Sequence, residues 1–377
     1  MKNEILIAES VSHLKVLSNL YRLITNNCAS CNLTFCTNKE KIGGESKETL
    51  FPEYGVVDWV TNPLHNVLFH CWIVFVGWKY KLINISTGPE GNHWSDSINV
   101  LFFYIGCVIY GKKTILTVKN TRSYLKSTPG ILSFVRNTAL KHIRGFTFET
   151  ETMRDVFHEE TNIDINKLGV SYDRYTDLNI VNIKTADIET YAEYSCVIGL
   201  LGGVHEHRRN YDDIIGALKK LPSEKRKKLL FVTLGNTPNG SDNAVIKKLK
   251  EWTNVDYKDG WLTAEEFEIR GLSCDVLISP LRKAFEYGTY KGSGSFGDAV
   301  LLRKKIIIPD FIDPRYEFAD ISIYYGRDID LSSVFENIFE YINEKTPDEY
   351  YSKFTTKSVY KNLVNDLSLN VFCDSGK

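Results

Sequence analysis

Residues 287–299, YGTYKGSGSFGDA, form the most glycine-rich segment of the chain, with four glycines in thirteen residues. The apolar run DVLISP (275–280) precedes this segment, and the apolar run KKIIIPDF (304–311) follows it. Short apolar runs bounded by turn residues predict buried strands. The part that begins at Ser293, SGSFGDAVLLRK, predicts the start of a helix. The glycines therefore lie where a buried strand passes into a helix.

A strand that passes through glycines into a helix is suited to binding an anion. Glycine lets the backbone approach a ligand closely, and the first N–H groups of a helix carry the positive end of its dipole. Ser293 and Ser295 add hydroxyl donors, and Lys291 adds a positive charge. Asp298, just inside the helix, could accept a hydrogen bond from a ribose hydroxyl, as carboxylates do in dinucleotide folds. We predict a diphosphate site here; a plain turn capped by Ser293 or Ser295 is the alternative.

A second segment, GLLGGVHEHRRNYDDIIGAL (199–218), also runs from a strand through glycines into a helix. Arg208 and Arg209 stand where the loop meets the helix, and the fork of an arginine donates two hydrogen bonds to phosphate oxygens. Neither segment matches the patterns GxxxxGK[ST] or GxGxxG. Two such junctions in one half of the chain favour the diphosphate prediction. A solvated helix start is the alternative for the arginines.

Strand and helix patterns alternate along the whole chain. This alternation is typical of parallel βαβ units and predicts two doubly wound, Rossmann-like α/β domains that face a central cleft. We place the domains at residues 1–180 and 181–350, and we expect the C-terminal helix in 351–377 to cross back to the first domain. The predicted strands are 4–10, 32–38, 80–87, 112–120, 145–150, 196–203, 227–236, 254–262, 275–280 and 305–311.

Composition sets limits on the class of protein. A chain of 377 residues fits about two domains, and 43% apolar with 25% charged residues is typical of a soluble globular protein. A net charge of -1 argues against a chain made for nucleic acid. The opening residues MKNEILIAESVSHLK lack the pattern of a signal peptide, which predicts a cytoplasmic protein.

The chain has eight cysteines. Cys107 and Cys196 lie in apolar runs, which predicts small core residues with reduced thiols. Cys28, Cys31 and Cys36 lie close together, but no second pair follows at the spacing of a zinc site. We therefore predict ordinary loop or strand cysteines and no metal centre.

Two apolar segments, 66–78 and 98–111, are shorter than the ~20 residues that a membrane-spanning helix needs. They predict two buried helices. Between Asp96 and Glu149 the sequence has eight lysines and arginines and no acidic residue. This basic interval predicts an anionic partner or peripheral contact with an anionic membrane. A solvated basic face is the alternative.

The second half resembles the C-terminal domain of GT-B glycosyltransferases, close to the family-4 "group 1" kind. Four stretches carry the resemblance, in family order, over about residues 196–312. In the first half, ILIAESVSHLKVLSNLYRLI and KKTILTVKN agree in the order of elements. The resemblance implies a nucleotide-sugar donor held mainly by the second domain, a retaining transfer, and no cofactor. The four stretches are GLLGGVHEHRRNYDDIIGALKKLP, LLFVTLGN, NVDYKDGWLTAEEFEIRGLSCDVLISP and YKGSGSFGDAVLLRKKIIIPDF.

The resemblance also implies roles for particular residues. Arg209 matches a basic residue that contacts the diphosphate, residues 260–262 match a segment that meets the base, and Asp298 matches a ribose-binding glutamate. Arg209 and Lys291 could take the place of a metal ion. The predicted donor-binding residues are Gly202, Gly203, Arg208, Arg209, Gly260, Trp261, Leu262, Tyr290, Lys291, Ser293, Gly294, Ser295 and Asp298.

The chain departs from the family pattern at the catalytic positions. The first of the paired glutamates lies eight residues before the second in the family, and that position is Tyr290 here. Glu286 is the nearest acidic residue and becomes a catalytic candidate. Where the family usually has an N-terminal histidine, this chain has Lys119 or Asn120. His13, after the first strand, could contact the acceptor or act as a base; a surface histidine is the alternative.

These observations predict a glycosyltransferase that moves a sugar from a nucleotide-sugar donor to a hydroxyl of a glycan or lipid-linked acceptor. Cations and helix-start N–H groups would stabilise the charge on the departing diphosphate. Two alternatives stay open. One is an epimerase of the same fold that acts on a UDP-sugar and needs carboxylates for elimination chemistry. The other is a non-catalytic, two-lobed sugar- or nucleotide-binding protein, a class that is usually exported.

Overall fold

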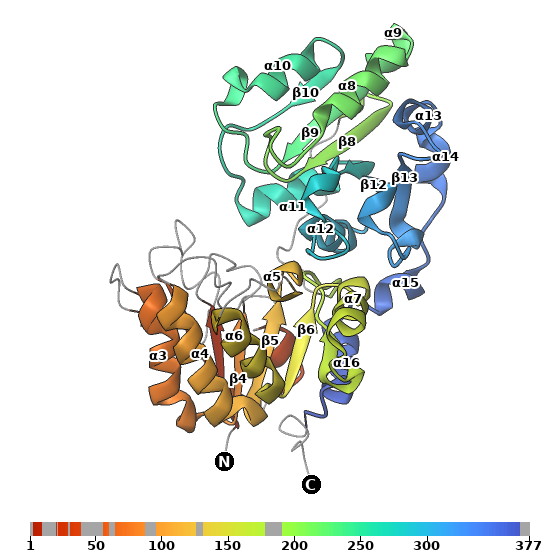
Figure 1. Cartoon of the computed structure of the whole chain (residues 1–377). Helices are drawn as coiled ribbons and strands as arrows, with labels where there is room; N and C mark the ends of the chain where they lie inside the picture. Colours follow the sequence, from red (N-terminus) through yellow and green to blue (C-terminus); the bar gives the residue numbers. More distant parts are fainter. Residues whose placement is uncertain are drawn as a thin grey trace. The chain divides into compact units, whose positions relative to one another are not determined.

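The computed structural model describes residues 3–9, 20, 22–28, 31–38, 56–59, 65–86, 96–125, 131–177 and 191–369. The chain divides into two compact units (Figure 1). The first unit comprises Met1–Asp173, Tyr290–Gly292 and Thr356–Lys377, and the second comprises Arg174–Thr289 and Ser293–Thr355. Residues 290–292, inside the opening glycine-rich segment, thus belong to the first unit although both flanks belong to the second.

The first unit is built on a seven-stranded parallel sheet with the strand order β3-β2-β1-β4-β5-β6-β7. Its central strands are buried on both faces, as expected of a parallel sheet covered by helices. The strands are β1 (Asn3–Glu9), β2 (Cys31–Asn38), β3 (Val56–Trp59), β4 (Leu82–Ser86), β5 (Thr114–Val118), β6 (Gly145–Phe148) and β7 (Leu168–Val170).

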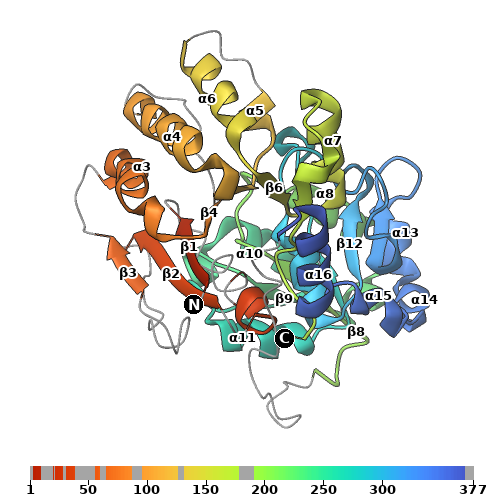
Figure 2. The ribbon, with the colours of Figure 1, turned by 90° about the horizontal axis from the view of Figure 1, so that it is seen from below.

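Helices cover both faces of this sheet. Figure 2 shows α3, α4 and α6 on one face and α16 on the other. Helix α16 approaches closely because Gly145 and Gly169 leave room for Leu363 and Leu367. The helices are α3 (His65–Val76), α4 (Asp96–Tyr110), α5 (Arg122–Leu125), α6 (Ile131–His142), α7 (Glu151–Thr161) and α16 (Thr356–Asp366).

The second unit has a six-stranded parallel sheet with the order β10-β9-β8-β11-β12-β13. The strand order reverses between β8 and β11, and the carboxyl ends of strands at such a switch point form the usual ligand site of this architecture. The strands are β8 (Cys196–Leu201), β9 (Leu229–Leu234), β10 (Asn254–Asp256), β11 (Val276–Ile278), β12 (Ile306–Pro309) and β13 (Ser322–Tyr325).

Several helices of the second unit begin at residues whose side chains cap the N-terminus of a helix. Thr263 and Glu266 form the capping box at the start of α11, and Asn243 accepts hydrogen bonds from the first turn of α10. The helices are α8 (Tyr211–Lys220), α9 (Ser223–Arg226), α10 (Ala244–Lys250), α11 (Ala264–Leu272), α12 (Gly294–Leu302), α13 (Leu331–Glu336), α14 (Ile338–Asn343) and α15 (Asp348–Ser352).

All ten predicted strands are present, but three more were missed: β3, β7 and β13. Strand β7 has three residues and lies beside a polar stretch, so no periodic signal marked it. The prediction that segments 66–78 and 98–111 are buried helices is wrong in part. Helix α4 buries one stripe and exposes a second apolar one, and Phe75 of α3 is also exposed. Among the described residues, no helix is long and apolar enough to cross a membrane.

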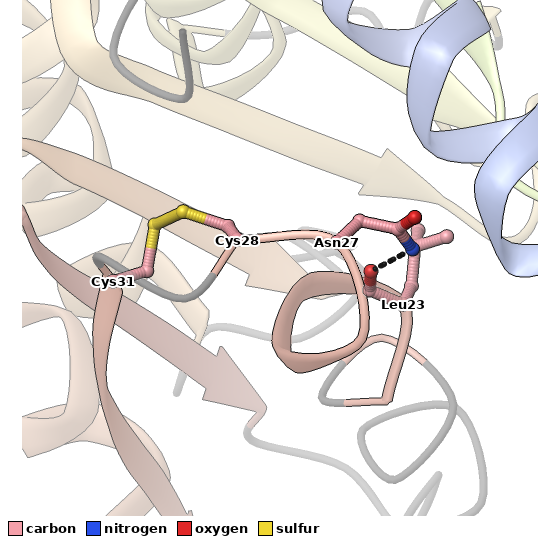
Figure 3. The surroundings of a disulfide bond; sticks show 4 residues. All are labelled: Leu23, Asn27, Cys28 and Cys31. Atoms are coloured by element: carbon pink, nitrogen blue, oxygen red, sulfur yellow. Dashed lines mark hydrogen bonds between the residues drawn. A yellow bond between two sulfur atoms is a disulfide. The ribbon is translucent and has the colours of Figure 1, made fainter. Parts of the chain in front are cut away.

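Cys28 and Cys31, predicted to be ordinary loop or strand cysteines, instead form a disulfide (Figure 3). The amide of Asn27 donates a hydrogen bond to the carbonyl of Leu23 at the end of a helical turn. Cys31 begins β2, and its N–H donates a hydrogen bond of 3.4 Å to the carbonyl of Cys28; the two Cα atoms lie 5.7 Å apart, within reach of a disulfide. Cys107 and Cys196 are free and buried, as predicted. The side chain of Cys36 lies outside the described residues.

Gly288 shows why the glycine-rich segment needs one of its glycines. Its φ of +83° lies in the left-handed region, and an added Cβ would overlap the backbone carbonyl of Ile312. Position 288 therefore needs glycine because of the neighbouring backbone of the protein itself and not because of a ligand.

We predict that Gly288→Ala lowers the free energy of unfolding by about 2–4 kcal/mol, because backbone strain adds to the overlap with a carbonyl that cannot move alone. Urea unfolding followed by circular dichroism measures this. The matched control is Gly216→Ala in α8, where an added Cβ meets nothing within 4 Å. That variant should gain about 0.5–1 kcal/mol. Equal effects at both positions would contradict the assigned role of Gly288.

Candidate functional site

The carboxyl edge of the second sheet collects the loops that the sequence singled out. The loop after β8 contains Gly202 to Arg209, the loop after β10 contains residues 260–262, and α12 begins after the loop that follows β11. Figure 1 shows how β8, β9 and α12 are placed within this unit. The structure therefore brings most of the predicted donor-binding residues to one edge of one sheet.

Arg209 is the central side chain of this edge. Its Nε donates a hydrogen bond to the carbonyl of Leu201 at 2.9 Å, and its guanidinium lies against Gly202. Gly202 has a φ of +75°, and an added Cβ would overlap the guanidinium. The loop therefore needs glycine at this position so that the arginine can fold back over it.

The charge of Arg209 is not neutralised by an ion pair within the described residues. Burial and the charge of Arg208 lower the pKa of Arg209, while Tyr211, Tyr287 and the carboxylate of Asp298, which is itself paired with Arg174, oppose the shift. A partly buried cation without a carboxylate partner is costly unless an anion supplies the missing charge. Arg208, by contrast, is exposed, and Gly203 is half-buried beside His205.

The start of α12 adds a second feature that suits an anion. Ser293 is the N-cap and accepts a hydrogen bond from the backbone N–H of Ser295 at 3.4 Å. The buried hydroxyl of Ser295 shares a hydrogen bond of 2.8 Å with Ser279, so it turns inward rather than toward solvent. Gly294 is exposed in the first turn. An anion at this turn would therefore contact the backbone N–H groups at the positive end of the helix dipole, and not the Ser295 hydroxyl.

Asp298, predicted to bind ribose, forms an ion pair with Arg174, whose Nε lies 3.2 Å from the carboxylate. The pair is mostly buried, so the carboxylate is fixed in place before any ligand arrives. A ribose hydroxyl would have to share this carboxylate with Arg174.

The segment 260–262 is tied to the loop after β9. Thr237 and Gly260 exchange two backbone hydrogen bonds of 3.0 Å, and Gly260 adopts a φ of +75°. Trp261 follows with 78% of its surface exposed, and Leu262 is half-buried. An exposed indole next to this held backbone, at the carboxyl edge, can stack on a flat ring such as a nucleobase.

Tyr290 and Lys291 belong to the first unit and are held there by hydrogen bonds. Lys291 forms a bridge with Asn120, and the carbonyl of Tyr290 accepts hydrogen bonds from Thr121. The Tyr290 hydroxyl donates to Glu160 of α7 at 2.7 Å. The donor-binding roles of both residues stay predictions, because these contacts hold them to the end of β5 and to α7.

At the carboxyl edge of the first sheet, Lys119 lies between Glu149 and Asp173. Lys119 follows β5, Glu149 follows β6, and Asp173 follows β7. The Lys119 ammonium donates hydrogen bonds to both carboxylates, with 2.9 Å to Asp173. Gly292 packs against Glu149, and an added Cβ there would overlap the carboxylate. Sequence reasoning found Lys119 but missed its partners, although all three follow strand ends.

The cluster holds a proton near neutral pH. Burial of the carboxyl and the charge of Asp173 raise the pKa of Glu149 to about 7, although Lys119 opposes the shift. Burial alone would lower the pKa of Lys119, but the two carboxylates raise it, so the lysine stays charged. One ammonium and two carboxyl groups thus share a buried site in which Glu149 can take up or release a proton.

The other catalytic candidates have different outcomes. Glu286 ends a short 3-10 turn, Lys283–Phe285, with a φ of 54°, and its role stays a prediction. His13 lies outside the described residues. Within the described residues, no group of three or more histidines, cysteines and carboxylates is arranged to hold a metal ion.

We predict that Glu149→Gln changes how stability depends on pH. The pKa of Glu149 rises from 4.5 to about 7 on folding, so the stability that its protonated form supplies is complete below pH 4.5 and is lost as the pH rises through 7. Relative to the parent chain, the variant should gain about 2 kcal/mol in unfolding free energy between pH 5 and pH 8. Urea unfolding at both pH values tests this, with the exposed Glu159→Gln as control. A constant difference would mean that the pKa of Glu149 is not raised on folding into the range between pH 5 and pH 8.

No protein-family model and no curated protein matches the chain. Solved structures do match. Anabaena Alr3699/HepE in complex with UDP has a TM-score of 0.65 at 12% identity, over 98% of this chain and 100% of that chain. WaaG, a glycosyltransferase involved in lipopolysaccharide biosynthesis, has a TM-score of 0.57 at 10% identity, over 99% of this chain and 100% of that chain.

A third match is UDP-GlcNAc 2-epimerase from Neisseria meningitidis bound to UDP-GlcNAc, with a TM-score of 0.57 at 12% identity, over 97% of this chain and 99% of that chain. At such identities the similarity concerns the fold. Two Rossmann-like units, each built on a parallel sheet, match these structures along nearly their full length. The chain therefore has the GT-B fold, as its sequence predicted.

Proposed function

We propose that the chain is a glycosyltransferase that moves a sugar from a nucleoside diphosphate sugar to a hydroxyl group of an acceptor. The observation that carries the proposal is the Arg209 guanidinium, fixed at the carboxyl edge of the second sheet without an ion-pair partner among the described residues. The similar Anabaena protein was solved with UDP and also with UDP and glucose, which supports a nucleotide-sugar donor.

The proposed chemistry follows from the charge that develops during transfer. When the bond between the sugar and the diphosphate breaks, negative charge grows on the phosphate oxygens. Arg209 and the N-terminal turn of α12 are already oriented, so they stabilise this charge without reorganisation. Because the charge is greatest late in bond breaking, these groups favour the transition state more than the bound donor.

The remaining donor contacts follow the same edge. Trp261 stacks on the base, Asp298 accepts hydrogen bonds from the ribose while it keeps Arg174, and Gly202 leaves room for the guanidinium of Arg209 that meets the phosphates. In this proposal the transfer retains the configuration of the sugar, needs no metal ion, and uses a glycan or lipid-linked acceptor, as the family resemblance implies.

One observation favours a second candidate function. Epimerisation of a UDP-sugar by elimination needs carboxyl groups that can exchange protons. Glu149, whose pKa is raised to about 7 by burial and by the charge of Asp173, supplies one such group beside a second carboxylate. Incubation with UDP-GlcNAc, followed by proton NMR, separates the two functions. A transferase should slowly transfer the sugar to water, and so release UDP, even without an acceptor. An epimerase should instead produce a sugar with altered configuration and keep the bond to UDP.

We predict that Arg209→Ala weakens UDP binding by about 1.5–3 kcal/mol, the usual loss for hydrogen bonds to a charged group. The UDP affinity of Arg209→Lys should lie between those of Arg209→Ala and the parent, because lysine keeps the positive charge but loses the two parallel N–H donors of the guanidinium. Isothermal titration calorimetry with UDP measures both. Lys247→Ala, an exposed lysine of α10, is the matched control and should bind UDP as the parent does. Equal UDP affinity in all four chains would remove the basis of the proposal.

A further inference from the structure

Helices α3 and α4 present large apolar side chains to solvent. Phe75 is 71% exposed, and Trp78, in the 3-10 turn Gly77–Lys79 that follows α3, is 68% exposed. Helix α4 adds four residues that are about half exposed: Ile98, Leu101, Val108 and Ile109. Scattered single residues of this kind are ordinary. Phe75, Trp78, Val108 and Ile109, however, come from the adjoining C-terminal ends of α3 and α4 and form a patch of the kind that marks interaction sites.

The exposed residues of α4 are not needed for its packing in the core. The helix already buries Val100, Phe103 and Cys107 at helical spacing against the sheet. Residues 98, 101 and 108 form a second stripe on another side. A helix that is apolar on more than one side is expected inside a large core or against a membrane.

Hydrogen bonds join the two helices into one surface. The hydroxyl of Tyr110 donates to the carbonyl of Val74 at 2.9 Å. The ammonium of Lys113 donates to the carbonyls of Gly77 and Tyr80 at 2.8 and 2.6 Å. Figure 2 shows α3 and α4 side by side at the outside of the first sheet. Phe75 and Trp78 therefore keep a fixed relation to the C-terminal half of α4.

The charges around the patch are positive. Lys79 lies over the ring of Trp78 at 5.6 Å from its centroid, and Lys112 is exposed directly after α4. In α3, α4 and the turns that follow them, residues 65–81 and 96–113, the sequence has four lysines and one acidic residue, Asp96. Aromatic and aliphatic side chains flanked by lysines are the composition that binds at the interface of an anionic bilayer.

We propose that the patch formed by Phe75, Trp78, Val108, Ile109, Lys79 and Lys112 binds the surface of an anionic lipid bilayer. At 12 and 15 residues, α3 and α4 are too short to span a bilayer, which takes ~20 residues, so they lie against it. The apolar side chains enter the boundary between headgroups and acyl chains, and the lysines face the lipid phosphates. This proposal does not rest on the proposed function, because the patch shares no residue with the donor site.

Flotation of the full chain with vesicles tests the proposal. The parent chain should bind vesicles of phosphatidylcholine with about one third phosphatidylglycerol, and binding to pure phosphatidylcholine should be at least tenfold weaker. Phe75→Ser/Trp78→Ser should lower binding at least tenfold. Lys79→Gln/Lys112→Gln should lower it roughly 25-fold, about fivefold per lysine. Added salt should weaken binding of the parent.

The control variant makes one aromatic-to-serine change and one lysine-to-glutamine change on the second unit. Phe339→Ser/Lys345→Gln alters an exposed aromatic residue of α14 and an exposed lysine, and it should float as the parent does. All variants should keep the parent's affinity for UDP, which separates this proposal from the donor site. The proposal is overturned if the parent does not float, if it floats equally with both vesicles, or if the patch variants float unchanged. If the parent instead forms a dimer in the absence of vesicles, and Phe75→Ser/Trp78→Ser is monomeric, the patch is a contact between copies of the chain rather than a lipid-binding surface.

Discussion

The donor site of the second unit depends on the close packing of one guanidinium against one glycine. Arg209 bends back over Gly202, donates to the carbonyl of Leu201, and remains partly buried without an ion-pair partner among the described residues. The parallel sheet makes this possible because the loops after its strands all emerge at one edge. Gly235 fits against the backbone of Gly202 there, so the loop after β9 closes on the loop after β8.

Much of the fold could be predicted from local patterns. Apolar runs gave the strands, and capping residues such as Thr263 marked where helices begin. The roles of individual glycines could not be predicted in this way. Gly288 makes room for Ile312 and Gly292 makes room for Glu149, which lies 143 residues earlier in the chain. A glycine-rich segment between a strand and a helix therefore suggests close approach, but not whether a ligand or the protein itself approaches.

Contacts between residues far apart in the sequence also explain why three charged residues near the candidate sites were not predicted. Glu149, Asp173 and Arg174 carry no local signal, because their partners come from other strands and loops of the same unit. Only Glu149 lies at the end of a predicted strand, which could have marked it, whereas Asp173 and Arg174 follow β7, which no periodic pattern indicated. The disulfide between Cys28 and Cys31 depends on how tightly the chain turns, and the second apolar stripe of α4 depends on which neighbours cover it.

The most direct test of the central claim is a crystal structure of the chain with UDP at saturating concentration. The account predicts that the diphosphate oxygens lie within hydrogen-bonding distance of the Arg209 guanidinium and of the backbone N–H groups in the first turn of α12, with the uracil ring near Trp261. UDP bound elsewhere on the chain, with Arg209 still bonded only to the carbonyl of Leu201, would contradict it.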